Sequence, residues 1–288
     1  MRIPTFLLAT ATFAFAVPED VTAVDPAMRE RLGLAPFYQR QILVDGFPIV
    51  SSPKVADDAL REAAWIIRHV LDGRKDILQA MTKAKVHLTV MAATEFTTDV
   101  PEHADLKPKE YWDRRARGLG ASIENPCVSC AEENLLEFKG DPYSTENIMI
   151  HEFAHAIHDT GLKSVDPTFD KRLKAAYDSA VAAGLWKGKY AGSNYHEYWA
   201  EATQSWFDDN RENDNEHNHV NTRVELKEFD PKVAALCAEV YGDKPWRYLR
   251  PSKRAPEDRA HLKGVPEGHV REFHWPAKAA EPKEQPKK

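Results

Sequence analysis

The sequence predicts an α+β fold that is mostly helical and has a small sheet near its N-terminus. Residues 36–52 hold two short apolar runs on either side of Asp45-Gly46, a pair that favours a tight turn between strands. From residue 55 onwards, apolar residues recur mainly at helical spacing. The 288 residues are 42% hydrophobic and 29% charged, which is typical of a globular chain that can bury a core without disulfides.

The first half of the chain should supply the sheet and the first helices. Residues 55–82 predict one long helix or two shorter ones broken near residue 72. Residues 86–91 alternate in polarity and predict a strand. Residues 97–130 are rich in Pro, Gly and charge, which indicates irregular surface chain. A short strand is expected at residues 135–138, where it could line a cleft and pair with an extended peptide.

Four helices are predicted in the second half of the chain, over residues 145–160, 168–184, 195–207 and 231–241. Ser144, Asn194 and Asp230 can act as N-caps, because their side-chain oxygens accept hydrogen bonds from the free N–H groups of a first turn. Pro231 fits the first turn of the last helix, since that position needs no N–H. Gly161 can end the first of the four helices.

The N-terminus has the composition of an export signal. Arg2 precedes a run of apolar and small residues, and residues 14–16 read Ala-Phe-Ala, which matches a signal-peptidase site. We therefore predict a signal peptide at residues 1–16 and a secreted, extracellular protein. The alternative is an ordinary buried N-terminal segment.

The rest of the chain is expected to form one domain over residues 17–275. Residues 276–288 are rich in Pro, Lys and Glu and predict a disordered tail. The formal net charge of -6 and the lack of a basic stripe argue against a nucleic-acid partner. No stretch after the N-terminus is long and apolar enough to predict a membrane helix.

The chain has three cysteines, Cys127, Cys130 and Cys237. In an exported protein one pair could be bridged, and three different pairs are possible. The Cys-x-x-Cys spacing lacks the βαβ context of a redox motif, and there is no second pair to make a zinc ribbon. We interpret the three cysteines as structural.

Metal chemistry is indicated by the sequence His151-Glu152-Phe153-Ala154-His155 inside the first of the four predicted helices. Two histidines four residues apart lie about 40° apart around a helix and about 6 Å apart along its axis, so both imidazoles can reach one metal ion. The glutamate between them points to the side, where it can take a proton from water activated by a zinc ion.

A hydrolytic zinc site usually has a third protein ligand. His158 is on the same face, but it lies about 10.5 Å along the axis from His151, so both cannot bind one ion. We expect His158 to be a partly buried polar neighbour. Glu197 and Glu201 are better candidates, because they share a face of the third predicted helix among apolar residues. One carboxylate could bind zinc while the other orients a ligating histidine.

Residues 147–207 resemble the catalytic core of the gluzincin metallopeptidases, in particular anthrax toxin lethal factor and the related secreted Pro-Pro endopeptidases. That group has a His-Glu-Phe-Gly-His motif, and here residues 151–155 read His-Glu-Phe-Ala-His. The group also has a tyrosine seven residues before a zinc-binding glutamate. This chain has Tyr190 seven residues before Glu197, which begins the sequence Glu-Tyr-Trp-Ala-Glu-Ala.

The resemblance implies a zincin-like α+β domain that binds one zinc ion. It implies that Glu197 is the third ligand and that Glu201 is the carboxylate behind a ligating histidine. It also implies that Tyr190 donates a hydrogen bond to the scissile carbonyl oxygen. The chain departs from the family pattern at His158, where an acidic residue is expected, and at Thr203, where an aromatic residue is expected. Neither departure removes a catalytic atom.

Together these features predict a secreted zinc endopeptidase that acts on a protein or peptide substrate, with Glu152 and Tyr190 as catalytic residues. The alternative is a non-catalytic secreted binding protein that keeps a structural zinc site. A dense polar segment at residues 208–219 could hold calcium or a second metal ion, but its spacing matches no EF-hand. We interpret it as a solvated loop.

Overall fold

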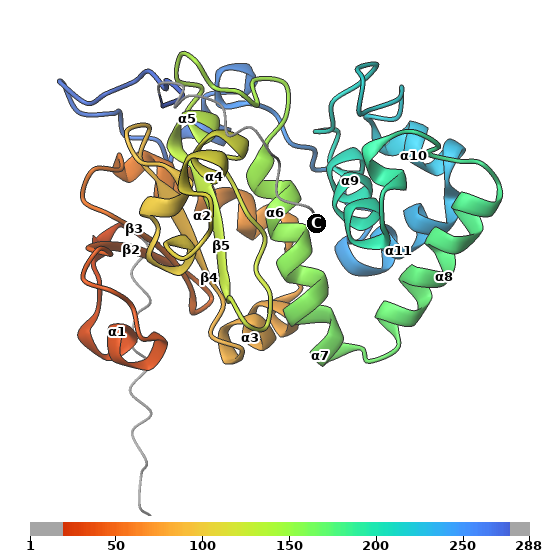
Figure 1. Cartoon of the computed structure of the whole chain (residues 1–288), viewed down its shortest axis with the longest axis horizontal. Helices are drawn as coiled ribbons and strands as arrows, with labels where there is room; N and C mark the ends of the chain where they lie inside the picture. The colour runs from red at the N-terminus through yellow and green to blue at the C-terminus, as the bar shows by residue number, and fades with distance from the viewer. Residues whose placement is uncertain (1–19, 277–288) are drawn as a thin grey trace, which may run out of the picture.

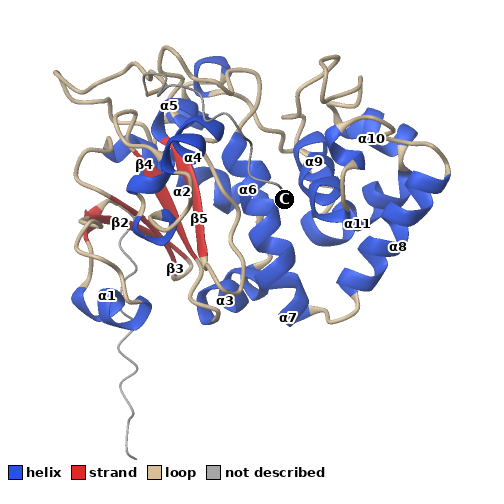
Figure 2. Cartoon of the chain, in the orientation of Figure 1, coloured by secondary structure: helices blue, strands red, loops and turns tan. Residues whose placement is uncertain are grey.

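The computed structural model describes residues 20–276, so the predicted signal peptide and all but the first residue of the predicted tail lie outside the described residues. A five-stranded sheet and the helices packed on it form the N-terminal half, and a group of helices forms the C-terminal half (Figures 1 and 2). The predicted α+β class, mostly helical with a small sheet near the N-terminus, is confirmed.

The strands lie in the sheet in chain order: β1 (Thr22–Ala23), β2 (Arg40–Val44), β3 (Phe47–Ser51), β4 (His87–Met91) and β5 (Cys127–Ala131). β1, β2 and β3 pair antiparallel, whereas β4 and β5 continue the sheet in parallel. The predicted hairpin is β2–β3, with Asp45 and Gly46 at φ angles of 48° and 89° in its turn.

Helices cover the first face of the sheet: α2 (Asp57–Val70), α3 (Lys75–Lys83) and α6 (Ile148–Ala156) (Figure 1). The break between α2 and α3 falls where it was predicted, and Gly73 lies there with a φ of 78°. On this face Val90 and Val128 join the main core. That core continues into the C-terminal half through Trp199 of α9 (Tyr195–Trp206), so the two halves share buried apolar contacts.

The second face of the sheet is covered by the chain that connects β4 to β5. This chain contains η1 (Thr97–Asp99), η2 (Pro101–His103) and α4 (Lys109–Arg115). The prediction of irregular surface chain over residues 97–130 is therefore wrong. β5 begins within this range, and all five of its residues are buried, so no alternation of polarity marks it in the sequence.

The remaining helices are α1 (Pro26–Leu32), α5 (Glu132–Leu135), α7 (Lys163–Val165), α8 (Phe169–Ala182), η4 (Tyr190–Gly192), α10 (Arg223–Phe229), α11 (Pro231–Tyr241), η5 (Pro251–Lys253) and η6 (Glu257–Arg259). α9 contacts α6, α8, α10 and α11 and so lies at the centre of the C-terminal half. The predicted caps of α9 and α11 are confirmed, because Asn194 accepts from the backbone N–H of His196 and Glu197, and Asp230 accepts from that of Val233.

Both predicted ends of the helix that contains His151 are wrong. The helix begins at Ile148, and its N-cap is Asn147 rather than Ser144. It also passes Gly161, because a π-helical turn (η3, Ile157–Leu162) continues it. A Cβ atom at position 161 would lie 2.7 Å from Cγ2 of Ile77, so this glycine allows close packing on α3 and does not end the helix.

The predicted strand at residues 135–138 is also wrong. Residue 135 ends α5, and Glu137 has a φ of 57°, which is incompatible with a strand. The buried Glu132 carboxylate accepts hydrogen bonds from the backbone N–H groups of Ala56 and Ala93, at 2.8 and 2.9 Å. These long-range bonds fix α5 in place, and neither partner can be read from the local sequence.

The three cysteines are free and buried, so none of the three possible bridges forms. Within residues 20–276, no helix has both the length and the apolar character that crossing a bilayer requires.

Candidate metal centre and cleft

Two helices bring three potential metal-binding side chains to one point. His151 and His155 extend from one face of α6, and Glu197 extends from the first turn of α9. The Nε2 atoms of the two histidines are 3.3 Å apart. The Glu197 carboxylate oxygen Oε2 lies 3.1 Å from Nε2 of His151 and 3.3 Å from Nε2 of His155.

This spacing fits a tetrahedral metal ion. Zinc bonds of about 2.0–2.2 Å to nitrogen and oxygen place neighbouring ligand atoms about 3.3 Å apart. Although burial alone would raise it, hydrogen bonds from His151 and His155 hold the pKa of the Glu197 carboxyl well below its usual range. Two imidazoles and one carboxylate suit zinc, and three protein ligands leave one coordination position open.

Hydrogen bonds at the start of α6 hold the two histidines in place. The carboxylate of Asp209 accepts from the backbone N–H of Asn147, at 2.9 and 3.1 Å. The side-chain oxygen of Asn134 accepts from the backbone N–H of Ile148 at 3.0 Å. These partners satisfy donors that a helix N-terminus leaves free, so the position of α6 is fixed from both sides.

Polar side chains behind the histidines form a buried network. Nδ1 of His151 lies 2.8 Å from Oε1 of Gln204 and 3.4 Å from Oε1 of Glu201. Oε2 of Glu201 lies 3.2 Å from Nε2 of His217. Gln204 in turn donates to Glu146 at 2.9 Å. Such partners fix the orientation and tautomer of a ligating histidine.

The segment 208–219 is only in part the solvated loop that was expected, because six of its twelve residues are exposed and three are buried. Asp209, Asn210 and His217 are buried, and Nδ2 of Asn210 donates to Oε2 of Glu201 at 3.1 Å. Within residues 20–276, no set of potential metal donors that lie close together includes this segment. Its polar residues instead support α6 and the Glu201 carboxylate.

Glu152 is adjacent to the three converging side chains and lines the same cleft. Burial raises the pKa of its carboxyl, although the charges of His151 and His155 act in the opposite direction. A carboxyl whose pKa is raised toward neutrality can both accept and return a proton. The structure therefore places a possible acid–base group beside the possible metal site.

Two tyrosines face this site. The ring of Tyr190 lies over that of His151 with centroids 6.1 Å apart and an angle of 25° between the rings. Burial, with the charges of Glu197 and Glu152, raises the pKa of Tyr190, so its hydroxyl keeps its proton and can donate. Tyr143 also lines the cleft, and burial with the charge of Glu152 raises its pKa to about 12.

The cleft has a volume of about 700 Å³, and residues 115–116 and 118–121 form one of its walls. Leu119 pairs antiparallel with Ser129 of β5 through two backbone hydrogen bonds of 3.3 and 2.9 Å. In such a pairing the backbone groups of the adjacent Gly118 and Gly120 point away from β5. The sheet edge at the cleft is therefore formed by residues 118–120 and not by the segment 135–138.

His158 does not join the converging donors. It is fully buried, and its Nε2 atom lies 3.0 Å from Oδ1 of Asp170. Burial lowers its pKa to about 4, so the ring is neutral at ordinary pH. The expected role of a buried polar neighbour is confirmed, although burial is complete and not partial.

Sequence reasoning missed Gln204, His217 and Tyr143. Gln204 could have been found, because it follows Glu197 by seven residues and so shares the helix face of Glu197 and Glu201. His217 and Tyr143 lie in segments without regular secondary structure, and only the fold brings them to the site.

Likeness to known proteins is found among solved structures. No protein-family model matches the chain. No curated protein sequence matches it either. Among solved structures, it is similar to the Pro-Pro endopeptidase PPEP-2 from Paenibacillus alvei, with a TM-score of 0.43 and 21% identity, covering 62% of this chain and 91% of the other.

Proposed function

We propose that this chain is a zinc-dependent peptidase, with His151, His155 and Glu197 as the metal ligands. The observation that carries the proposal is the convergence of their three donor atoms within 3.1–3.3 Å of one another, beside Glu152 and open to a cleft. A purely structural zinc would need neither an adjacent carboxyl nor an open coordination position.

Zinc in this site would supply Lewis acidity that polarises the scissile carbonyl group and lowers the pKa of the attacking water. Glu152 accepts the proton that this water loses and passes it to the nitrogen of the leaving amine. Tyr190 donates a hydrogen bond to the oxygen on which negative charge develops, and loss of one such donor typically costs about 100- to 1000-fold in rate. Glu201 and Gln204 keep His151 oriented.

The backbone groups that line the cleft favour an extended peptide as the substrate. Gly118 and Gly120 present backbone groups along one wall, to which an extended peptide could add as a strand. A Cβ atom at either position would lie 3.0 Å or less from Glu152 or His155, so the two glycines let this wall pack closely on α6. With the predicted signal peptide, this favours a secreted enzyme that acts on extended segments of proteins or peptides.

Removal of the metal tests the proposal directly. Wild-type protein dialysed against a chelator should lose hydrolysis of a proteome-derived peptide library, and added zinc should restore it. Mass spectrometry of the library would measure both steps. Protein that binds zinc in the His151 site but cleaves no peptide would support the alternative, a non-catalytic zinc-binding protein.

Gly120→Ala should lower kcat/KM for a library-derived peptide by about 100-fold, the typical cost of misplacing a reacting group by about 1 Å. The added Cβ would lie 2.8 Å from Cβ of His155 and 3.2 Å from two of its ring atoms, so the ring must shift. The matched control is Gly161→Ala, whose Cβ meets Ile77. That variant should have a lower Tm and an unchanged kcat/KM, and equal kinetic losses in both variants would contradict this account.

A further inference from the structure

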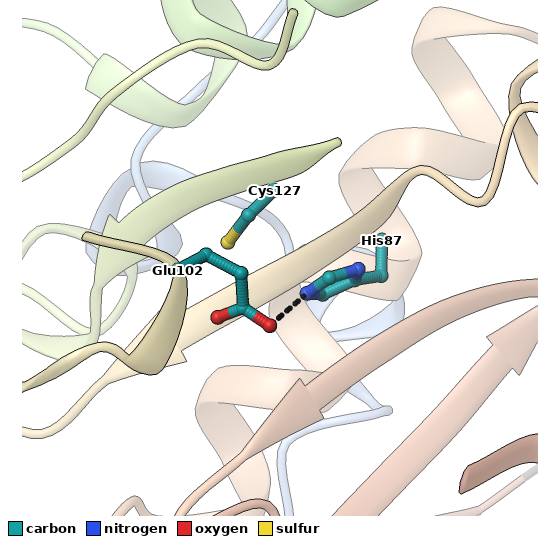
Figure 3. A group of neighbouring side chains, drawn as sticks. All are labelled: His87, Glu102 and Cys127. Atoms are coloured by element: carbon teal, nitrogen blue, oxygen red, sulfur yellow. Dashed lines mark ion pairs between the residues drawn. The ribbon is translucent and has the colours of Figure 1, made fainter. Parts of the chain in front are cut away.

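A second group of potential metal ligands lies on the second face of the sheet. We propose that His87, Glu102 and Cys127 bind a divalent metal ion with borderline-soft character, such as zinc. One nitrogen, one carboxylate oxygen and one sulfur from these residues all lie within 4.8 Å of one another. Figure 3 shows the three side chains pointing toward a common point between β4, β5 and the segment that covers them.

The register of the sheet creates this group. His87 begins β4 and Cys127 begins β5, and the two residues are paired neighbours in the parallel ladder. Paired residues in a sheet project from the same face. Val128 joins the core under α6, so Cys127 and His87 project from the opposite face, where η2 supplies Glu102.

One ligand atom lacks a good partner. Nε2 of His87 is buried and makes no hydrogen bond, although it lies 3.3 Å from Oε1 of Glu102. His87 as a whole is only 3% exposed, so water does not readily satisfy this atom. An unsatisfied buried nitrogen costs free energy, and coordination to a metal ion would remove that cost.

The charges and surroundings of the group also favour a cation. Cys127 is fully buried, and no disulfide occupies its sulfur atom. The thiolate is the form that binds metal. Tyr38 donates a hydrogen bond to the other oxygen of Glu102, which orients that carboxylate as partners of metal ligands commonly do.

The donor set selects the kind of ion. Thiolate and imidazole ligands favour zinc and related transition metals, whereas calcium and magnesium require mostly oxygen ligands. In a tetrahedral zinc site, the sulfur and nitrogen ligand atoms are about 3.5 Å apart. The three side chains therefore need only small rotations to close around an ion.

This site would be structural and distinct from the cleft. It would tie η2, and with it the segment 97–115, to β4 and β5. The same segment leads into residues 115–116 and 118–121, which form one wall of the cleft. An ion on the second face would therefore stabilise the cleft wall without touching a substrate.

Cobalt substitution tests the proposal with a signal that depends on sulfur. Full-length protein freed of metal and titrated with Co²⁺ should show thiolate-to-cobalt charge-transfer absorption, which the His151 site cannot produce because it has no sulfur ligand. Cys127→Ser should abolish this absorption and lower the bound metal by one equivalent. Cys130→Ser is the matched control, because Cys130 is equally buried in β5 but projects from the other face.

A second variant separates ligand loss from misfolding. Glu102→Gln keeps the shape of the side chain and removes its charge, and it should weaken cobalt binding at this site while circular dichroism stays unchanged. Wild-type protein without the charge-transfer absorption would overturn the proposal. Absorption that persists in Cys127→Ser, or that is lost equally in Cys130→Ser, would also overturn it.

Discussion

Glu152→Gln should lower kcat/KM for peptide hydrolysis by about 100- to 10,000-fold, the usual contribution of a general acid–base group. The amide has the same shape as the carboxyl but can neither take the proton from water nor pass it to the leaving amine. Because Glu152 is not one of the three converging donors, the bound zinc should be unchanged. Steady-state kinetics together with metal analysis would measure the two properties separately.

The matched control is Glu228→Gln, the same exchange at an exposed position of α10. This variant should keep both its zinc and its activity. If Glu152→Gln hydrolyses peptides as fast as wild type, the assigned proton transfer is wrong, even if zinc is required. If it loses zinc as well as activity, Glu152 would be a ligand, and the arrangement of the site would need revision.

Local signals in the sequence predicted the elements that depend on near neighbours. Asn194 and Asp230 marked the starts of α9 and α11, because a cap and its partners lie within one turn of chain. The spacing of His151 and His155 is also a local property, since any helix places them on one face. The predictions for α9, α11 and the β2–β3 hairpin therefore agree with the structure, whereas the predicted ends of the helix that contains His151 do not.

The predictions failed where polar side chains find distant partners. Glu132 is buried against backbone groups of residues 56 and 93, so a segment that resembles a strand in sequence is a short helix followed by a turn. Asn210 and His217 are buried against Glu201, so part of a segment with the composition of a surface loop is buried, although Asp208, Glu212 and His219 remain exposed. A polar amino-acid composition therefore indicates that a segment is exposed to solvent only when its polar side chains find no hydrogen-bond partners inside the fold.

In the candidate site, too, the sequence predicted local spacing but not the contacts between distant segments. The sequence was enough to predict that Glu197 and Glu201 share one face of a helix. It did not predict that this face packs against α6. The structure brings Glu197 to within 3.3 Å of both histidines. It also places Gln204 closer than Glu201 to Nδ1 of His151.

Glu197→Gln should weaken zinc binding in the His151 site by more than 10- to 100-fold. A loss of 10- to 100-fold is typical when a residue that only orients a metal ligand is removed. Glu201→Gln removes such a residue and so provides the direct comparison. An amide oxygen is a poorer zinc ligand than a carboxylate, and the exchange also removes the negative charge that faces both histidines. Hydrolysis should fall with zinc occupancy and recover in part at high zinc concentration. Zinc titration monitored by calorimetry would give both affinities.

The comparison is best made in a Cys127→Ser background, where only the His151 site should bind metal. Glu197 and Glu201 are one turn apart on α9, carry the same charge and both lie near His151. Their amide variants differ mainly in the ring nitrogen that they affect, which is Nε2 for Glu197 and Nδ1 for Glu201. A larger loss of zinc affinity in Glu201→Gln than in Glu197→Gln would reverse the assignment of ligand and orienting carboxylate. Equal and small losses would mean that neither carboxylate binds zinc, because removing a ligand changes affinity more than removing its support.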